Sequence, residues 1–125
     1  MIGTFIYKAL TDNAAVIAIV STRVYPVVIP QTNDLPALVY SIGSAVPSHT
    51  NDGSSKLDKF QFQVYCLARS YAAVDNLAAK VRVALHGYKT PIIQEIRYNT
   101  EMDDYEESTM IFVRVMTFDL RLKII

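Results

Sequence analysis

The C-terminal segment of the chain has the residue pattern of one long β-strand. Fully extended, this strand would be longer than the diameter of a small globular protein. One side of an extended residue 109–125 stretch carries Met110, Phe112, Met116, Phe118, Leu120 and Leu122, with Arg114 interrupting the series. Residues 109–123 alone would extend roughly 50 Å at about 3.3 Å per residue. A compact chain of 125 residues is only about 36 Å across. The segment must therefore bend, coil or project, and projecting strand edges invite pairing with another chain.

The opposite side of this strand is apolar too in its first half. Ile111, Val113 and Val115 occupy it before Asp119, Arg121 and Lys123 make it polar. Apolar residues on both sides indicate a strand that is buried on both faces. We expect the first half of the closing strand to be covered on both sides.

Two further strands form a predicted β-hairpin with a long polar tip. Residues 37–46 and 59–68 have strand patterns, and the second alternates strictly, with Phe60, Phe62, Val64 and Cys66 on one face. Residues 47–55 between them combine Pro, Ser, Asn, Asp and Gly, which is typical of a loop. Residues 23–26 and 92–99 are shorter predicted strands.

Three helical segments complete the predicted order. We expect helices over residues 2–10 and 14–20, with a break near Asp12, and a third helix over residues 71–85. Four of residues 14–20 are Val or Ile, so a strand is the alternative for that segment. Ser70 is suited to cap the third helix, and Gly87 to end it. The expected element order is then α-α-β-β-β-α-β-β, within a single domain spanning residues 1–125.

Composition excludes several classes of function. Twelve Lys and Arg balance twelve Asp and Glu, so no net charge attracts nucleic acid or an acidic membrane. The apolar runs are too short to span a bilayer, so no membrane partner is expected. A hydrophobic content of 51% with zero net charge favours association with other copies.

The ordinary constellations of catalysis are missing from the sequence. His49 lies in a polar loop, His86 ends a helix, and Cys66 lies on the apolar face of a strand, where a core thiol is expected. The four glycines form no phosphate-binding loop. The acidic run that starts at Glu101 lacks the spacing of a calcium loop, and a solvated loop is its simplest interpretation. We therefore predict no enzyme activity, catalytic residue, cofactor or metal site.

The order of segments resembles the tailed-bacteriophage tail completion and tail terminator proteins, the neck proteins described as gp17-like. The resemblance covers nearly the whole chain. It rests on the first helix up to Leu10, residues 12–20, 23–26 and 36–40, the Asp52–Gly53 turn, residues 62–66, Ser70 and Tyr71 with Asp75, Leu77, Val81 and Leu85, residues 104–106, Thr109, and residues 118–121.

The resemblance implies an α+β fold, in which a curved antiparallel sheet has two or three helices packed on one face. It implies a homo-oligomeric ring, usually a hexamer, at the head-proximal end of the tail tube. Such a ring ends tube polymerisation and provides the surface for head–tail joining. The implied partners are other copies of the chain, the major tail tube protein and the head–tail connector proteins, with DNA only passing through the lumen. The implied location is the virion neck, and the host cytoplasm during assembly.

Two sets of residues are candidates for these contacts. The hairpin tip is the candidate tail-tube docking loop, with residues His49, Thr50, Asn51, Asp52, Gly53, Ser54, Ser55 and Lys56. The acidic run is the candidate ring or lumen surface, with residues Glu101, Asp103, Asp104, Glu106 and Glu107. A head-closure or head–tail adaptor ring is the alternative function, and a non-viral domain that binds a small ligand is a further one.

Overall fold

The predicted class and element order are confirmed. A computed structural model of the chain describes residues 2–21, 23–27, 35–49, 55–91 and 93–122, with the backbone alone described at residues 2, 44–49 and 55–58. The elements are α1 (Ile2–Thr11), α2 (Ala14–Val20), β1 (Val24–Pro26), β2 (Ala37–His49), β3 (Ser55–Ala68), α3 (Tyr71–Leu85), β4 (Ile93–Glu106) and β5 (Ile111–Leu122).

The five strands form one open sheet in the order β1-β2-β3-β5-β4. The pairs β2–β3, β3–β5 and β4–β5 are antiparallel, whereas the short β1 lies parallel to β2. Leu38 N donates to Arg23 O (2.9 Å) and Val27 N donates to Tyr40 O (2.8 Å), which fixes β1 on the edge of β2. The sheet is therefore antiparallel except for this one edge strand.

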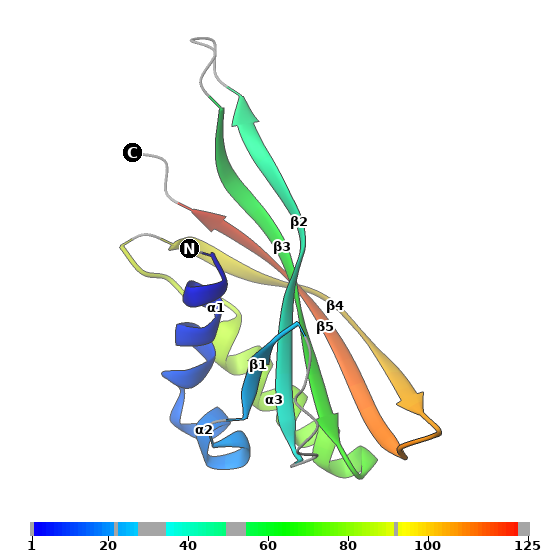
Figure 1. Ribbon diagram of the computed structural model, residues 1–125. Coiled ribbons are helices and arrows are strands. Elements are labelled where there is room, and N and C mark those ends of the chain that lie inside the picture. Colours follow the sequence, from blue (N-terminus) through cyan, green and yellow to red (C-terminus); the bar gives the residue numbers. More distant parts are fainter. Residues whose placement is uncertain (1, 22, 28–34, 50–54, 92, 123–125) are drawn as a thin grey trace.

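All three helices pack on the same face of the sheet (Figure 1). The sheet is strongly twisted, and its two hairpins project beyond the helices at opposite ends. The β2–β3 hairpin extends past the N-terminal end of α1, and the β4–β5 turn lies at the other end of the molecule. The closing strand β5 is thus longer than the helix-covered part of the molecule, and it coils and projects, as its length predicted.

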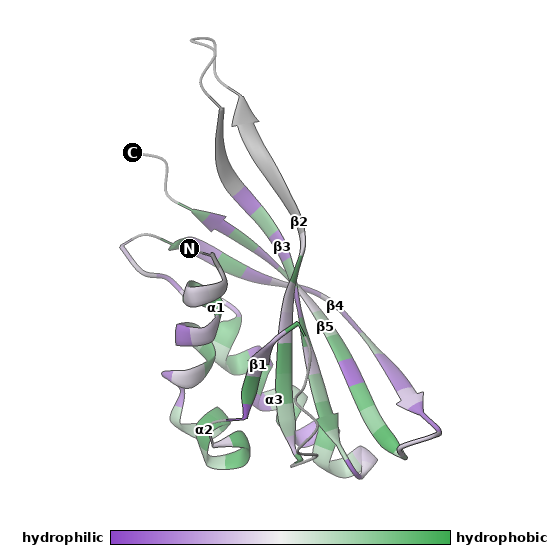
Figure 2. Cartoon of the chain, in the orientation of Figure 1, coloured by the Kyte–Doolittle hydropathy of each residue, from purple (hydrophilic) through white to green (hydrophobic). Residues whose placement is uncertain are grey.

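The core lies between the helices and the centre of the sheet. Phe62 of β3 and Phe118 of β5 pair directly and stack with ring centroids 5.5 Å apart, and both are fully buried. The predicted apolar face of β3 is buried at Phe60, Val64 and Cys66 as well. Figure 2 shows hydrophobic residues (green) alternating with hydrophilic ones (purple) along β3 and concentrated in the lower parts of β2 and β5. Burial raises the pKa of the Cys66 thiol, which agrees with an inert core residue.

The predicted helix boundaries are confirmed by their hydrogen bonds. The Asn13 side chain accepts from the N–H groups of Ala15 and Val16, and α1 and α2 meet at this point with a bend of 90°. The Ser70 side chain accepts from Ala73 N (3.2 Å) at the start of α3. Gly87 follows the end of α3 with a φ of +81°, where a glycine avoids steric strain.

No single helix of the described residues is long and apolar enough to cross a membrane. The bent pair α1–α2 has the required length and composition only when its two halves are taken together. The pair contributes Ile6, Leu10, Val16 and Val20 to the protein core.

Two predictions about the closing strand and its neighbour were wrong. Val113 and Val115 are half-buried rather than fully covered, because the described helices cover only the opposite face of the sheet. The strand expected at residues 92–99 continues to Glu106, so the acidic run belongs to a strand and not to a loop. Arg114 of β5 binds two of these acids, Glu101 and Asp103, and so stabilises the acidic part of the strand.

Candidate functional site and interaction surfaces

The candidate docking loop lies at the end of the projecting β2–β3 hairpin. His49 is the last residue of β2 and pairs with Ser55, the first residue of β3, and Ser48 pairs with Lys56. Residues 47–49, expected in the loop, therefore belong to a strand, because pairing with β3 continues past a register shift between Val46 and Pro47. The remaining loop residues, Thr50, Asn51, Asp52, Gly53 and Ser54, lie outside the described residues.

The acidic run is divided between the two faces of the sheet. Between the two register shifts of β4, Ile96 and Tyr98 face the helices, opposite Leu120 and Phe118. The second shift is a bulge between Tyr98 and Thr100. Its extra residue reverses the alternation, so Glu101 and Asp103 face the helices opposite Met116 and Arg114. Asp104 and Glu106 point to the other face, and Glu107 lies in the exposed turn that follows. The five acids of this run therefore do not form one continuous surface, because they are divided between the two faces of the sheet and the turn.

The two inward-facing acids bind Arg114, whose side chain is about nine-tenths buried. Arg114 Nη1 donates to Glu101 Oε2 (2.8 Å), and Arg114 Nε donates to Asp103 Oδ1. Arg114 Nη2 donates to the Tyr71 hydroxyl (3.1 Å) and to Asp75 Oδ1 (3.3 Å), both on α3. The guanidinium therefore fastens β4 and β5 to the first turns of the helix that covers them.

Two tyrosines complete the cluster around this cation. The Tyr71 hydroxyl donates to Asp103 Oδ2 (2.9 Å), and the Tyr98 hydroxyl donates to Glu101 Oε1. The Arg114 guanidinium carbon lies 5.6 Å from the centre of the Tyr71 ring, close enough for a cation–π contact. Every oxygen of the two inward-facing carboxylates thus has a hydrogen-bond donor from a neighbouring side chain.

The cluster shifts the pKa values of its members in opposite directions. Burial alone would lower the pKa of Arg114, but its hydrogen bonds to Asp103 and Glu101 outweigh burial and raise it. Burial tends to raise the pKa of Glu101, yet hydrogen bonds from Tyr98 and Arg114 bring that pKa below its ordinary value. The hydrogen bond from Arg114 likewise lowers the pKa of Asp103. All three groups are held in their charged forms near neutral pH.

Among the described residues, those that cover the outer edge of β4 do so along its first half only. Gly87 N donates to Ile96 O (2.8 Å), Ile96 N donates to Tyr88 O (3.2 Å), and Tyr98 N donates to His86 Nδ1 (3.1 Å). Beyond the bulge, strand alternation turns the main-chain groups of Glu101, Asp103 and Tyr105 outward. No further strand of the described chain pairs with β4 on this side. This half of the edge is available for main-chain hydrogen bonds with another chain.

Nothing in the described part of the chain resembles a metal centre. No group of three or more His, Cys, Asp or Glu residues there is arranged to hold a metal ion. The acids that are close together are already neutralised by Arg114.

Residues 4–123 match the sequence model of a protein family described as Tail completion protein gp17. The chain belongs to this family. Membership identifies a structural protein of a virus tail and not an enzyme. The resemblance inferred from the order of segments is thereby confirmed.

The family fold also occurs in a solved virion. The chain is similar to a chain in a structure titled "Virion of native gene transfer agent (GTA) particle", with a TM-score of 0.71 and 19% sequence identity. The match covers 94% of this chain and 90% of that chain. At this level of identity the similarity establishes a shared fold. No curated protein matches the sequence.

Removing the Arg114 guanidinium should destabilise the protein, because it leaves Asp103 without a cation and Glu101 with only the longer contact to Arg82 (3.9 Å). Breaking a fully buried ion pair costs about 3–5 kcal/mol, and Asp103 is half exposed, so we expect a loss of about 2 kcal/mol for Arg114→Met. Urea unfolding measures this loss. The exposed Arg69→Met is the matched control, with an expected change of less than about 0.5 kcal/mol. Equal unfolding midpoints for the two variants would contradict the role assigned to Arg114.

The cluster should also make stability fall in acid. Glu101 and Asp103 have lower pKa values in the folded chain than their ordinary values of 4.5 and 3.8. The unfolded chain therefore takes up protons first as the pH falls. The stabilisation from these two carboxylates is complete at pH values above 4.5, the higher of their ordinary pKa values. It is lost as the pH falls through their lowered pKa values in the folded chain. Unfolding midpoints measured from neutral pH down to about pH 3 should decrease more steeply for the wild type than for Arg114→Met. Parallel curves would show that these carboxylates are not linked to Arg114.

Proposed function

We propose that this chain is the subunit of a ring that closes the head-proximal end of a tail tube. The ring ends polymerisation of the tube and provides the surface on which the head is joined. The observation that carries the proposal is the family match over residues 4–123, which covers nearly the whole chain. The ring consists of about six copies, and its direct partners are the major tail tube protein and the head–tail connector proteins. It assembles in the host cytoplasm and remains in the neck of the virion.

Features of the described chain support self-association in a ring. The second half of β4 is an open strand edge, and β2 extends beyond β1 from Ser41 to His49 with one side unpaired by any described strand. Two different edges of one subunit can pair only in a head-to-tail manner, and a head-to-tail contact closes into a ring when its rotation permits. Zero net charge removes the long-range repulsion between copies.

The projecting β2–β3 hairpin is suited to reach a neighbouring protein ring. Its strands pass beyond the layer of helices and remain paired as far as His49 and Ser55 (Figure 1). We assign tail-tube docking to the residues of this tip, His49 to Lys56. DNA then passes through the lumen without sequence-specific contacts. The outward-facing acids Asp104, Glu106 and Glu107 remain candidates for surfaces of the ring.

The function is tested by adding the protein to tail tube protein that is polymerising in vitro. We expect tubes that stop growing and carry a ring at one end in electron micrographs, because a bound ring covers the sites where subunits add. Tubes that keep growing, together with binding of the protein to filled heads, would instead support the head-closure alternative. Tubes of unchanged length and no binding to heads would contradict both functions.

Deleting residues 51–55 should separate docking from folding. Of these residues the structure describes Ser55, which pairs with His49 at the end of the hairpin, and Phe60 is the first described core residue of β3. We therefore expect an unchanged urea midpoint and an unchanged oligomeric state by native mass spectrometry. Capping of tail tubes should be lost. A deletion variant that folds and caps tubes as the wild type does would remove the docking role from this loop.

A further inference from the structure

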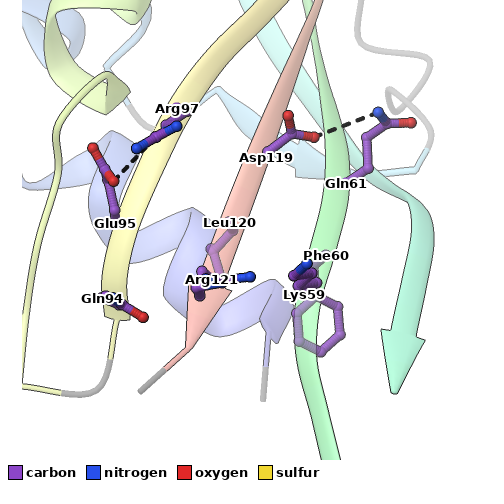
Figure 3. Close-up of a pocket in the computed structure, with 9 residues that line it drawn as sticks. All are labelled: Lys59, Phe60, Gln61, Gln94, Glu95, Arg97, Asp119, Leu120 and Arg121. Atoms are coloured by element: carbon purple, nitrogen blue, oxygen red, sulfur yellow. Dashed lines mark hydrogen bonds and ion pairs between the residues drawn. The ribbon is translucent and has the colours of Figure 1, made fainter. Parts of the chain in front are cut away.

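A groove lies on the sheet face opposite the helices, at the end of the sheet remote from the β4–β5 turn (Figure 3). Its volume is about 510 Å³. Strand alternation places Lys59, Gln61, Asp119 and Arg121 on this face, because Phe60 and Leu120 between them are buried. β4 adds Glu95 and Arg97, paired with Arg121 and Asp119. The groove is thus built from three adjacent strands.

The groove contains two cationic side chains without an ion-pair partner among the described residues. Both acids are engaged: Glu95 Oε1 accepts from Arg97 (3.1 Å), and Asp119 accepts from Gln61 (3.5 Å) and Asn99 (3.0 Å). Lys59 and Arg121 lie directly opposite each other on β3 and β5, and neither forms an ion pair with a described residue. Like charges directly opposite on neighbouring strands destabilise a sheet. Two such cations in a groove therefore point to an acidic group supplied from outside.

The same subunit presents unpaired acids at the far end of the sheet. Glu106 and Glu107 are exposed at the β4–β5 turn, and Glu107 has no ion-pair partner among the described residues. Met110, with 66% of its surface exposed, adds an apolar side chain to this tip. The tip and the groove are separated by the stretch of β5 from Ile111 to Arg121, about 33 Å of extended chain. The two surfaces cannot meet within one chain.

We propose that the β4–β5 turn of one copy, with Glu106 and Glu107, docks in the Lys59–Arg121 groove of the next copy. The charge complementarity of the two surfaces selects a second copy as the occupant. The contact joins different surfaces of identical subunits, so it is head-to-tail and generates a ring or a filament, not a two-fold dimer. This inference rests on the self-association proposed above, and it identifies the residues that carry one of its contacts.

Charge reversal on each side tests the contact. The groove variant is Lys59→Glu with Arg121→Glu, and the tip variant is Glu106→Lys with Glu107→Lys. In each variant alone, groove and tip carry the same sign, so native mass spectrometry should find at least tenfold less oligomer than for wild type. Mixed in equal amounts, the variants offer opposite signs at every contact and should assemble with the two chains alternating.

Lys80→Glu is the matched control, since it reverses a charge on the exposed side of α3, away from both surfaces, and should assemble as wild type does. Urea unfolding of each variant separates loss of contact from loss of fold. A folded groove variant that assembles as wild type does would overturn the contact and leave the ring intact. A mixture that stays monomeric where wild type assembles would also overturn it. Wild type that remains monomeric at millimolar concentration and fails to cap tail tubes would instead contradict the proposed ring.

Discussion

The pairing of β3 with β5 across the Phe62–Phe118 stack is the interaction on which the rest of the structure depends. These two strands are the centre of the sheet, and all three helices cover the face that they bury. Both strands are longer than the layer of helices. The helices therefore pack against the central part of each strand and do not cover its ends. The hairpins therefore project in opposite directions, and strand edges stay open where no helix or strand of the same chain covers them. The open strand edges and the projecting hairpins both follow from strands that extend beyond the helix-covered core.

Because of Arg114, the acidic second half of β4 can pair with β5. Its guanidinium replaces an apolar side chain in the buried series of β5 and binds Glu101 and Asp103 across the β4 pair. Contacts with Tyr71 and Asp75 extend this attachment to α3. The bulge near Thr100 directs the remaining acids, Asp104 and Glu106, to the opposite face. One acidic segment thereby contributes some of its residues to the Arg114 cluster and leaves others exposed on the opposite face.

Local patterns predicted the secondary structure well and the charged surfaces poorly. The alternation in β3, the caps Asn13 and Ser70 and the length of the closing strand are each set by nearby residues. The continuation of β4 through the acidic run depends on Arg114, which is distant in the sequence. A lone arginine in an apolar alternation was the available signal, because a buried cation requires acidic partners. The groove at Lys59 and Arg121 depends on strand register, which the sequence patterns did not supply.

We expect other molecules to cover the projecting ends of the sheet when the protein is assembled. Hydrogen–deuterium exchange, compared between the isolated subunit and the assembled ring or capped tail, tests this expectation. Amides of residues 99–107 and of the strands that line the groove should exchange more slowly after assembly. Peptides from the buried centre of β3 should exchange equally slowly in both states. Identical exchange at the strand ends in the subunit and in the assembled tail would show that no other molecule covers them.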